Sequence, residues 1–283
     1  MAAIFSIASG KGGVGKTLIT TSFGILLSRQ GKKVIMIDGD MGLRNMDLGL
    51  GVENECLYNI YDAAQGKCFL EEAIIPVSKN LDFLPASQND SWDTVFPSAF
   101  DTVLEDIQNS YDFILIDCPA GLGKGIETAF SLSDHVVLVI APSWASRRNA
   151  DRLRTMVKPQ ISAHFVLNQF SYVNDRQIGF DDMLETVDPD LFGGVLPYSE
   201  AVNQLSHFGH MTELDNDCAF SKALAYILRS ILEDKEFPVT RWKSLVCQGD
   251  KENEKILNGL PLRKSHYGLT WNSGSKVYRR RRR

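Results

Sequence analysis

"GKGGVGKT", residues 10–17, lies almost at the start of the chain and fits the pattern G-x4-G-K-[ST]. Glycines in this pattern let the backbone curl, so that several N–H groups point at one phosphate chain. A predicted strand over 2–8 precedes the pattern and a predicted helix over 17–30 follows it, which is the required context. The sequence therefore predicts a phosphate-binding loop, formed by Gly10, Lys11, Gly12, Gly13, Val14, Gly15, Lys16 and Thr17.

The last two residues of the loop have separate expected roles. Lys16 is expected to reach the β- and γ-phosphates, and the Thr17 hydroxyl to hold Mg²⁺. The helix that begins near Gly15 adds roughly half a positive charge from its dipole. A glycine-rich turn with chance lysines is the weaker interpretation, because pattern and context agree.

Carboxylates are predicted at the ends of two further strands. Asp117 closes the apolar run "FILI" and is expected to orient Mg²⁺ as a Walker B acid, although it could be only a turn or cap residue. Asp38 closes "VIMI", and Asp40 follows two residues later. Paired carboxylates at the end of a strand suit the positioning of a water molecule and a metal ion. We expect Asp40 to orient the attacking water and Asp38 to support the metal.

Short apolar runs alternate with helix candidates along the chain. Near-continuous apolar strands suit a parallel sheet that is covered on both faces. The alternation indicates an α/β fold with a doubly wound, mostly parallel sheet. The remaining strands are expected over 34–37, 81–84, 113–116, 136–140, 164–168 and 193–197, and the remaining helices over 97–109, 146–157 and 219–234. We expect one domain over 1–237 and a basic tail over 238–283.

Charge is distributed unevenly in this chain of 283 residues. Residues 239–283 hold 12 Lys+Arg and 3 Asp+Glu, a balance of +9, while the whole chain has a formal net charge of -5. The basic segment ends in "RRRRR" and is expected either to meet an anionic surface or to be a solvated end. The five cysteines form no CxxC pair, and the N-terminus has no signal-peptide pattern. These features favour a cytoplasmic protein.

These motifs together resemble the MinD/ParA family of deviant Walker A ATPases, and most closely its MinD branch. The resemblance spans roughly residues 2–235 and rests on five segments, "KGGVGKT" (11–17), "DGDMGLRNMDLGLG" (38–51), "LPASQ" (84–88), "DCPAG" (117–121) and "ASRRNADRL" (145–153). It implies a P-loop NTPase of SIMIBI-like architecture that binds ATP and Mg²⁺. It also implies a homodimer in the ATP state, with slow hydrolysis that a partner stimulates.

The resemblance also implies roles for individual residues. Lys11 would reach across the dimer to the nucleotide of the partner subunit, although it could be a solvent-facing loop lysine. Asn168 would hydrogen-bond adenine and Pro197 would pack beside the base, although each could be a plain turn residue. Arg148 and Asp151 lie in a helix that resembles a partner- and nucleotide-responsive region of the family.

The implied function is regulation of division-site placement, with cycling between the cytosol and the membrane. The implied partners are a MinC-like inhibitor, a MinE-like activator and an anionic membrane surface. The tail departs from the family pattern, since its amphipathic stretches, 240–246 and 251–262, are each only one or two helical turns long. We expect a composite anchor made of these turns, the arginine run and dimerisation. The alternatives are a ParA-like ATPase that binds DNA, an FlhG-like regulator of flagellar number, and a nucleotide-dependent scaffold with negligible hydrolysis.

Overall fold

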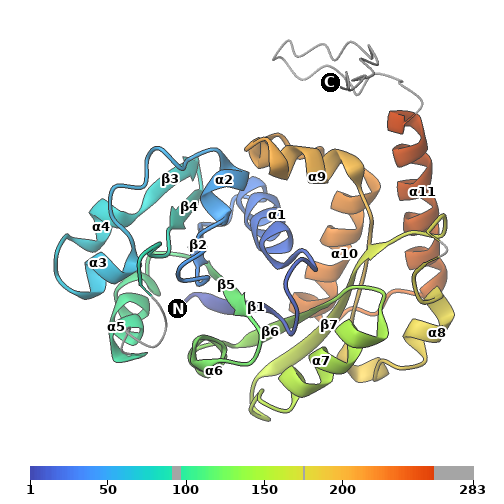
Figure 1. Cartoon of the computed structure of the whole chain (residues 1–283), viewed down its shortest axis with the longest axis horizontal. Coiled ribbons are helices and arrows are strands. Elements are labelled where there is room, and N and C mark those ends of the chain that lie inside the picture. The colour runs from blue at the N-terminus through green and yellow to red at the C-terminus, as the bar shows by residue number, and fades with distance from the viewer. Residues whose placement is uncertain (91–96, 175, 258–283) are drawn as a thin grey trace, which may run out of the picture.

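An eight-stranded sheet forms the centre of the molecule in the computed structural model, which describes residues 1–90, 97–174 and 176–257 (Figure 1). The strand order is β3-β4-β2-β5-β1-β6-β7-β8. All neighbouring strands run parallel except β3, which is antiparallel to β4 at one edge. The strands are β1 (Ala3–Ser9), β2 (Val34–Asp38), β3 (Ile75–Ser78), β4 (Leu81–Leu84), β5 (Phe113–Ala120), β6 (His135–Ile140), β7 (Ser162–Phe170) and β8 (Phe192–Pro197).

Helices cover both faces of this sheet. Helices α1 and α10 pack on one face and α6 and α7 on the other, so the predicted doubly wound α/β fold is confirmed (Figure 1). The α-helices are α1 (Lys16–Arg29), α2 (Met46–Leu50), α3 (Ile60–Ala64), α4 (Leu70–Ala73), α5 (Pro97–Ile107), α6 (Lys124–Ser131), α7 (Trp144–Arg154), α8 (Phe180–Leu184), α9 (Glu200–His207), α10 (Ala219–Glu233) and α11 (Val239–Leu257). The described ranges also contain the short 3-10 helices η1 (Pro189–Leu191) and η2 (Met211–Glu213).

The buried strands follow directly from their apolar sequences. Every residue of β2 is buried, and so are five of the six residues of β6. Each of the seven predicted strands matches one in the structure to within two residues at its start, although β5 extends to Ala120. The sequence analysis missed β3, whose sequence "IPVS" contains a proline. Proline lacks the N–H that a central strand donates, which fits the position of β3 at the sheet edge.

The segment after residue 238 differs from the expectation of separate amphipathic turns. Residues 239–257 form one helix, α11, which packs on β8 and α10. Its apolar residues Trp242, Leu245 and Val246 are buried in the core. Residues three and four apart lie on one helix face, and this apolar face of α11 packs against β8 and α10. A lipid-facing role is therefore wrong for 240–246, whose apolar residues face the protein core. Leu257 in the second predicted stretch is exposed, and 258–262 and the arginine run lie outside the described residues, so that part of the anchor stays a prediction. The division of the chain after residue 237 stays a prediction.

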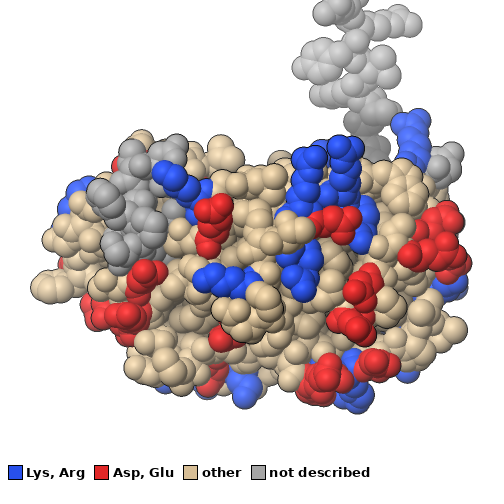
Figure 2. Space-filling model, turned by 90° about the horizontal axis from the view of Figure 1, so that it is seen from below, with Lys and Arg blue, Asp and Glu red and all other residues tan. Residues whose placement is uncertain are grey.

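The surface of the body carries both signs of charge. Figure 2 shows one face on which basic side chains gather near the upper middle, with acidic side chains beside and below them. Outside 239–283 the sequence holds 30 - 12 = 18 Lys+Arg and 35 - 3 = 32 Asp+Glu. The most basic part of the chain is thus its C-terminal sequence, beyond an acidic body.

Candidate functional site

The predicted phosphate loop joins β1 to α1 at the carboxyl edge of the sheet. Gly15 precedes the first helical residue and has a φ of 91°, in the left-handed region that favours glycine. A Cβ atom at this position would also lie 2.3 Å from Nδ2 of Asn168. The loop therefore needs glycine here both for its backbone conformation and for its contact with the end of β7.

Three amide side chains from distant parts of the chain are hydrogen-bonded to backbone carbonyl oxygens of the loop. Asn168 Nδ2 donates to the carbonyl oxygen of Val14 at 2.8 Å, and Gln169 Nε2 donates to that of Gly13 at 3.4 Å. Asn149, on α7, donates to the carbonyl oxygen of Gly10 at 3.2 Å. These bonds engage three carbonyl oxygens of the loop, which would leave its N–H groups available for a phosphate chain. Sequence analysis missed the roles of Asn149 and Gln169, because no local spacing connects them with the loop.

Lys16, Thr17 and Asp117 come together at the start of α1. Thr17 Oγ1 donates to Asp117 Oδ2 at 2.5 Å, and Lys16 is a buried lysine whose charge acts on Asp117. Thr20, one turn further along α1, approaches Asp117 Oδ1 at 3.4 Å. Thr20 was not predicted, although a threonine one helical turn after Thr17 lies on the same face. Burial raises the pKa of Asp117 to about 6, against the lowering effects of Lys16 and Thr17.

Asp38 lies beside Asp117 on the neighbouring strand. The two residues are partners in the parallel register of β2 and β5, and both side chains are buried. Asp38 accepts hydrogen bonds from the backbone N–H groups of Asp40 at 2.9 Å and Met46 at 3.3 Å. Burial, together with repulsion from Asp117, raises the pKa of Asp38. A divalent cation beside these two carboxylates would relieve this cost.

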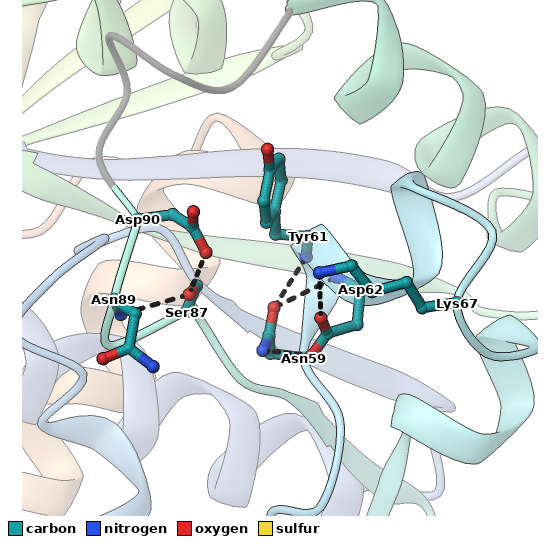
Figure 3. A network of polar contacts seen from close by, with 7 residues as sticks. All are labelled: Asn59, Tyr61, Asp62, Lys67, Ser87, Asn89 and Asp90. Atoms are coloured by element: carbon teal, nitrogen blue, oxygen red, sulfur yellow. Dashed lines mark hydrogen bonds and ion pairs between the residues drawn. The ribbon is translucent and has the colours of Figure 1, made fainter.

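The loop that carries Asp40 is held in place by the turn after β4. The N–H group of Gly42 donates to the carbonyl oxygen of Ser87 at 2.8 Å. The Ser87 hydroxyl in turn donates to Asp90 Oδ2 at 2.6 Å and accepts from the N–H group of Asn89 at 3.3 Å. Figure 3 shows these three side chains together. The half-buried Asp40 carboxyl has a raised pKa because of burial, which the charge of Lys16 opposes. Asp40 is thus a positioned acid close to the phosphate loop.

The same figure shows a second polar group, which anchors α3 next to this turn. The Asn59 side chain accepts hydrogen bonds from the N–H groups of Tyr61 and Asp62 at the start of α3 (Figure 3). The N–H group of Ile60 donates to the carbonyl oxygen of Pro85 at 2.9 Å, directly before the turn. The α3 region therefore supports the Asp40 loop indirectly, through the segment that the sequence analysis quoted as "LPASQ".

Comparison with known proteins agrees with this arrangement. The model of a family described as an AAA domain matches residues 2–168. The septum site-determining protein MinD of Helicobacter pylori is 32% identical over 249 residues, which cover 83% of this chain and 92% of that protein. The chain belongs to the MinD family.

Two solved structures support this assignment. A chain of the MinC:MinD cell division protein complex of Aquifex aeolicus matches with a TM-score of 0.73 at 31% identity, covering 85% of this chain and 99% of that one. The MinD of Pyrococcus horikoshii, solved in complex with Mg-ADP, matches with a TM-score of 0.70 at 27% identity over 82% of this chain and 97% of that one. This MinD-family protein is accordingly a P-loop ATPase.

The residues present fit a nucleotide with Mg²⁺. Mg²⁺ prefers oxygen ligands and usually keeps several water molecules, so few protein ligands are needed. The Thr17 hydroxyl and the buried carboxylates Asp38 and Asp117 are oxygen donors at one end of the phosphate loop. They would hold Mg²⁺ beside phosphates that the loop N–H groups and Lys16 bind.

Lys11 and the predicted α7 residues lie on the surface of this MinD-family protein. Lys11 is exposed, and its carbonyl oxygen accepts a hydrogen bond from Ser9 Oγ at 2.8 Å. Arg148 and Asp151 are both exposed on α7. Asp151 forms an ion pair with Arg147, and Arg147 also donates a hydrogen bond to the Thr186 hydroxyl. The sequence analysis had not singled out Arg147. Arg148 and Lys11 are therefore accessible to a second molecule.

The predicted base-binding residues lie at the ends of β7 and β8. Asn168 is buried and bonds the phosphate loop, while Pro197 is buried under α11. Next to them, a pocket of about 980 Å³ opens between the loops that follow β6, β7 and β8 and the last turns of α11. Gln169 and Tyr198, the residues that directly follow Asn168 and Pro197, line it. The pocket thus adjoins both predicted base contacts.

Proposed function

We propose that this protein is a MinD-type regulator of division-site placement that dimerises around MgATP and hydrolyses it slowly. The observation that carries the proposal is the pair of lysines on one loop. Lys16 is buried beside Asp117, whereas Lys11 is exposed at the rim of the same loop. One lysine thus serves the nucleotide of its own subunit, and the other is free to reach the nucleotide of a partner.

Hydrolysis follows from the placement of these groups. The loop N–H groups and Lys16 would hold the phosphates, and Thr17, Asp38 and Asp117 would hold Mg²⁺. Mg²⁺ held there would supply positive charge to offset the charge that develops on the phosphoryl oxygens. Asp40, on the loop held by Ser87, orients the attacking water. The partner's Lys11 completes the charge neutralisation, so hydrolysis depends on dimerisation.

A complementation experiment tests the role of Lys11 across the dimer. Lys11→Ala and Asp40→Asn are each expected to lose most ATPase activity. When equal amounts of the two variants are mixed with MgATP at protein concentrations that saturate dimer formation of both, about half of the dimers contain one copy of each variant. Each of these has one site with an intact Asp40 and a lysine from the other subunit. We expect about a quarter of the wild-type rate to return. Lys32→Ala, which changes an exposed lysine after α1, is the control. An equimolar mixture as inactive as its components would refute the arrangement.

The proposed protein partners are a MinC-like inhibitor and a MinE-like activator. Support for the inhibitor comes from the similarity to a chain in the MinC:MinD complex of Aquifex aeolicus. Arg148 and Asp151 offer exposed charges of opposite sign on α7 for such a contact. If α7 is the contact, Arg148→Glu should abolish co-purification with a MinC-like protein while ATP affinity stays unchanged. Retained co-purification would place the contact elsewhere.

The proposed localisation is cytoplasmic, with peripheral attachment to an anionic membrane in the ATP state. The "RRRRR" sequence supports this, since each arginine near an anionic leaflet contributes about 1 kcal/mol. No helix in the described ranges is long and apolar enough to cross a membrane. Pelleting with phosphatidylglycerol vesicles should be stronger with ATP than with ADP and should disappear when 258–283 are deleted. Equal pelleting after the deletion would refute the attachment, and retention on DNA instead would favour a ParA-like role.

A further inference from the structure

Helix α11 is hydrogen-bonded to both loops that adjoin the predicted base contacts. Asp250 accepts hydrogen bonds from the Ser171 hydroxyl at 2.5 Å and from the N–H group of Tyr172 at 2.9 Å. These two residues follow β7. Asn253 accepts from the N–H group of Glu200 at 2.9 Å and donates to the carbonyl oxygen of Tyr198 at 2.9 Å. Asp250 and Asn253 are three residues apart and therefore lie on one face of the helix.

Close packing brings α11 to this position. Gly249 is buried against the end of β8, where a Cβ atom would lie 2.7 Å from the Cβ atom of Pro197. Any larger residue would push the helix away from Pro197. Further along the helix, Lys251 and Leu257 line the pocket of about 980 Å³ together with Tyr172 and Tyr198. One side of the pocket is thus α11, and the other consists of the loops that α11 holds.

We propose that Asp250 and Asn253 are positioning residues for the base end of the nucleotide site. The inference rests on the proposed function, in which ATP binds with its base beside Asn168 and Pro197. Asp250 fixes the loop after β7, and Asn253 fixes the loop after β8 and the first N–H group of α9. The two side chains act on the nucleotide through these loops and hold the base-side wall in place before the base arrives.

This arrangement has a consequence for selectivity between ligands. The phosphate loop is supported by Asn149, Asn168 and Gln169, none of which is bonded to α11 in the described part of the chain. Loosening the α11 contacts should therefore weaken binding of the base without weakening binding of the phosphates. Hydrogen bonds to a charged acceptor contribute about 1.5 kcal/mol or more, which corresponds to about tenfold in affinity. Preorganised loops convert this gain into affinity for the ligand.

The test compares MgATP with magnesium tripolyphosphate, which has the phosphate chain but no base. Dissociation constants of both ligands are measured by calorimetry for the full chain, for Asp250→Asn and for Asn253→Ala. Asp250→Asn should bind MgATP about tenfold more weakly than the wild type, and Asn253→Ala, which loses two neutral hydrogen bonds, about fivefold or more. Tripolyphosphate affinity should be unchanged in both variants. Glu252→Gln is the matched control, because Glu252 on the same helix accepts from the N–H group of Ala219 on α10 and, among the described residues, is hydrogen-bonded to neither loop. It should leave both constants unchanged.

Several outcomes would overturn the inference. Unchanged MgATP affinity in both variants would show that the loops do not need α11. An equal loss for both ligands, or the same loss in Glu252→Gln, would show a general structural effect. If the wild type binds tripolyphosphate but not MgATP, the proposed function itself fails, which is distinct from a failure confined to the variants.

A second measurement uses the unaltered protein and does not depend on how the variants fold. Amide hydrogen exchange is followed over 171–173, 198–200 and 249–253 with each ligand. MgATP should slow exchange in all three segments, because a bound base stabilises the loops and, reciprocally, the helix that holds them. Magnesium tripolyphosphate should slow exchange in the phosphate loop alone. Slowing of the three segments by both ligands, or by neither, would contradict the inference.

Discussion

Replacement of Asp117 by asparagine should stabilise the nucleotide-free protein at alkaline pH. Asp117 is buried at the end of β5, next to Asp38 on β2. Burial raises the pKa of Asp117 from its ordinary value of 3.8 to about 6. The folded protein therefore binds a proton more tightly than the unfolded chain does between these values. The stability from this group is fully present below pH 4 and is lost as the pH rises through 6.

The size of the effect follows from the part of this interval that an experiment covers. The lower pH of the experiment, 5, lies about one unit below the folded-state pKa of Asp117, and at pH 8 the group is fully ionised. One unit corresponds to about 1.4 kcal/mol in the free energy of unfolding. Wild-type protein loses this stability, whereas Asp117→Asn does not. Removal of the Asp117 charge also lowers the pKa of Asp38, which adds in the same direction. The asparagine amide can donate to the Thr17 hydroxyl, so that contact can be kept with its polarity reversed.

The assay is urea unfolding at pH 5 and pH 8 without nucleotide, for wild type and Asp117→Asn. The quantity compared is the change in the free energy of unfolding between the two pH values, because altered packing contributes equally to both. We expect the wild type to lose about 1 to 2 kcal/mol more than the variant. With MgATP at pH 8 the wild type should instead be the more stable of the two proteins, because the Asp117 carboxylate then faces Mg²⁺. Equal losses in both proteins would refute the assignment of a raised pKa to this carboxyl.

Three further substitutions have expected outcomes. Gly15→Ala should weaken MgATP binding in calorimetry, because holding alanine in the left-handed backbone conformation of residue 15 costs about 1 to 2 kcal/mol. An MgATP affinity equal to that of the wild type would contradict the loop geometry. Asp40→Asn should lower the ATPase rate about 100-fold or more with little change in nucleotide affinity, and retained turnover would remove Asp40 from the proposed mechanism. Trp242→Ala should cost about 3 to 5 kcal/mol in urea unfolding, because this side chain is buried against Phe192 and Gly194. A loss under 1 kcal/mol would show that α11 is only loosely attached to the body.

Local patterns made the central strands and the phosphate loop predictable. In β2 and β6 the apolar runs are buried on both faces, and an uninterrupted run of apolar residues predicts such burial. The order of Gly15, Lys16 and Thr17 between a strand and a helix likewise specifies a loop without tertiary information. The strands and the strand–loop–helix order were predicted correctly because each decision depends on residues that are neighbours along the chain, while phosphate binding by the loop stays a prediction.

Contacts between distant segments were not predictable in this way. Asn149 and Gln169 reach the phosphate loop from 139 and 156 residues away, and no local spacing connects either residue with the loop. The same limit explains the error over α11. Trp242, Leu245 and Val246 form an apolar helix face, but only the tertiary structure shows whether lipid or β8 covers it. Amphipathicity identifies a buried face without identifying what buries it.

Sedimentation velocity of the full chain with MgATP and with MgADP tests the proposed switch most directly. Asp40→Asn is used so that ATP survives the run, and Lys11→Ala in the same background removes the lysine across the interface. We predict a dimer of the 31.6 kDa chain with MgATP, a monomer with MgADP, and a weakened dimer when Lys11 is replaced. A monomer at saturating MgATP, or a dimer that ignores both the nucleotide and Lys11, would contradict an ATP-driven dimeric switch.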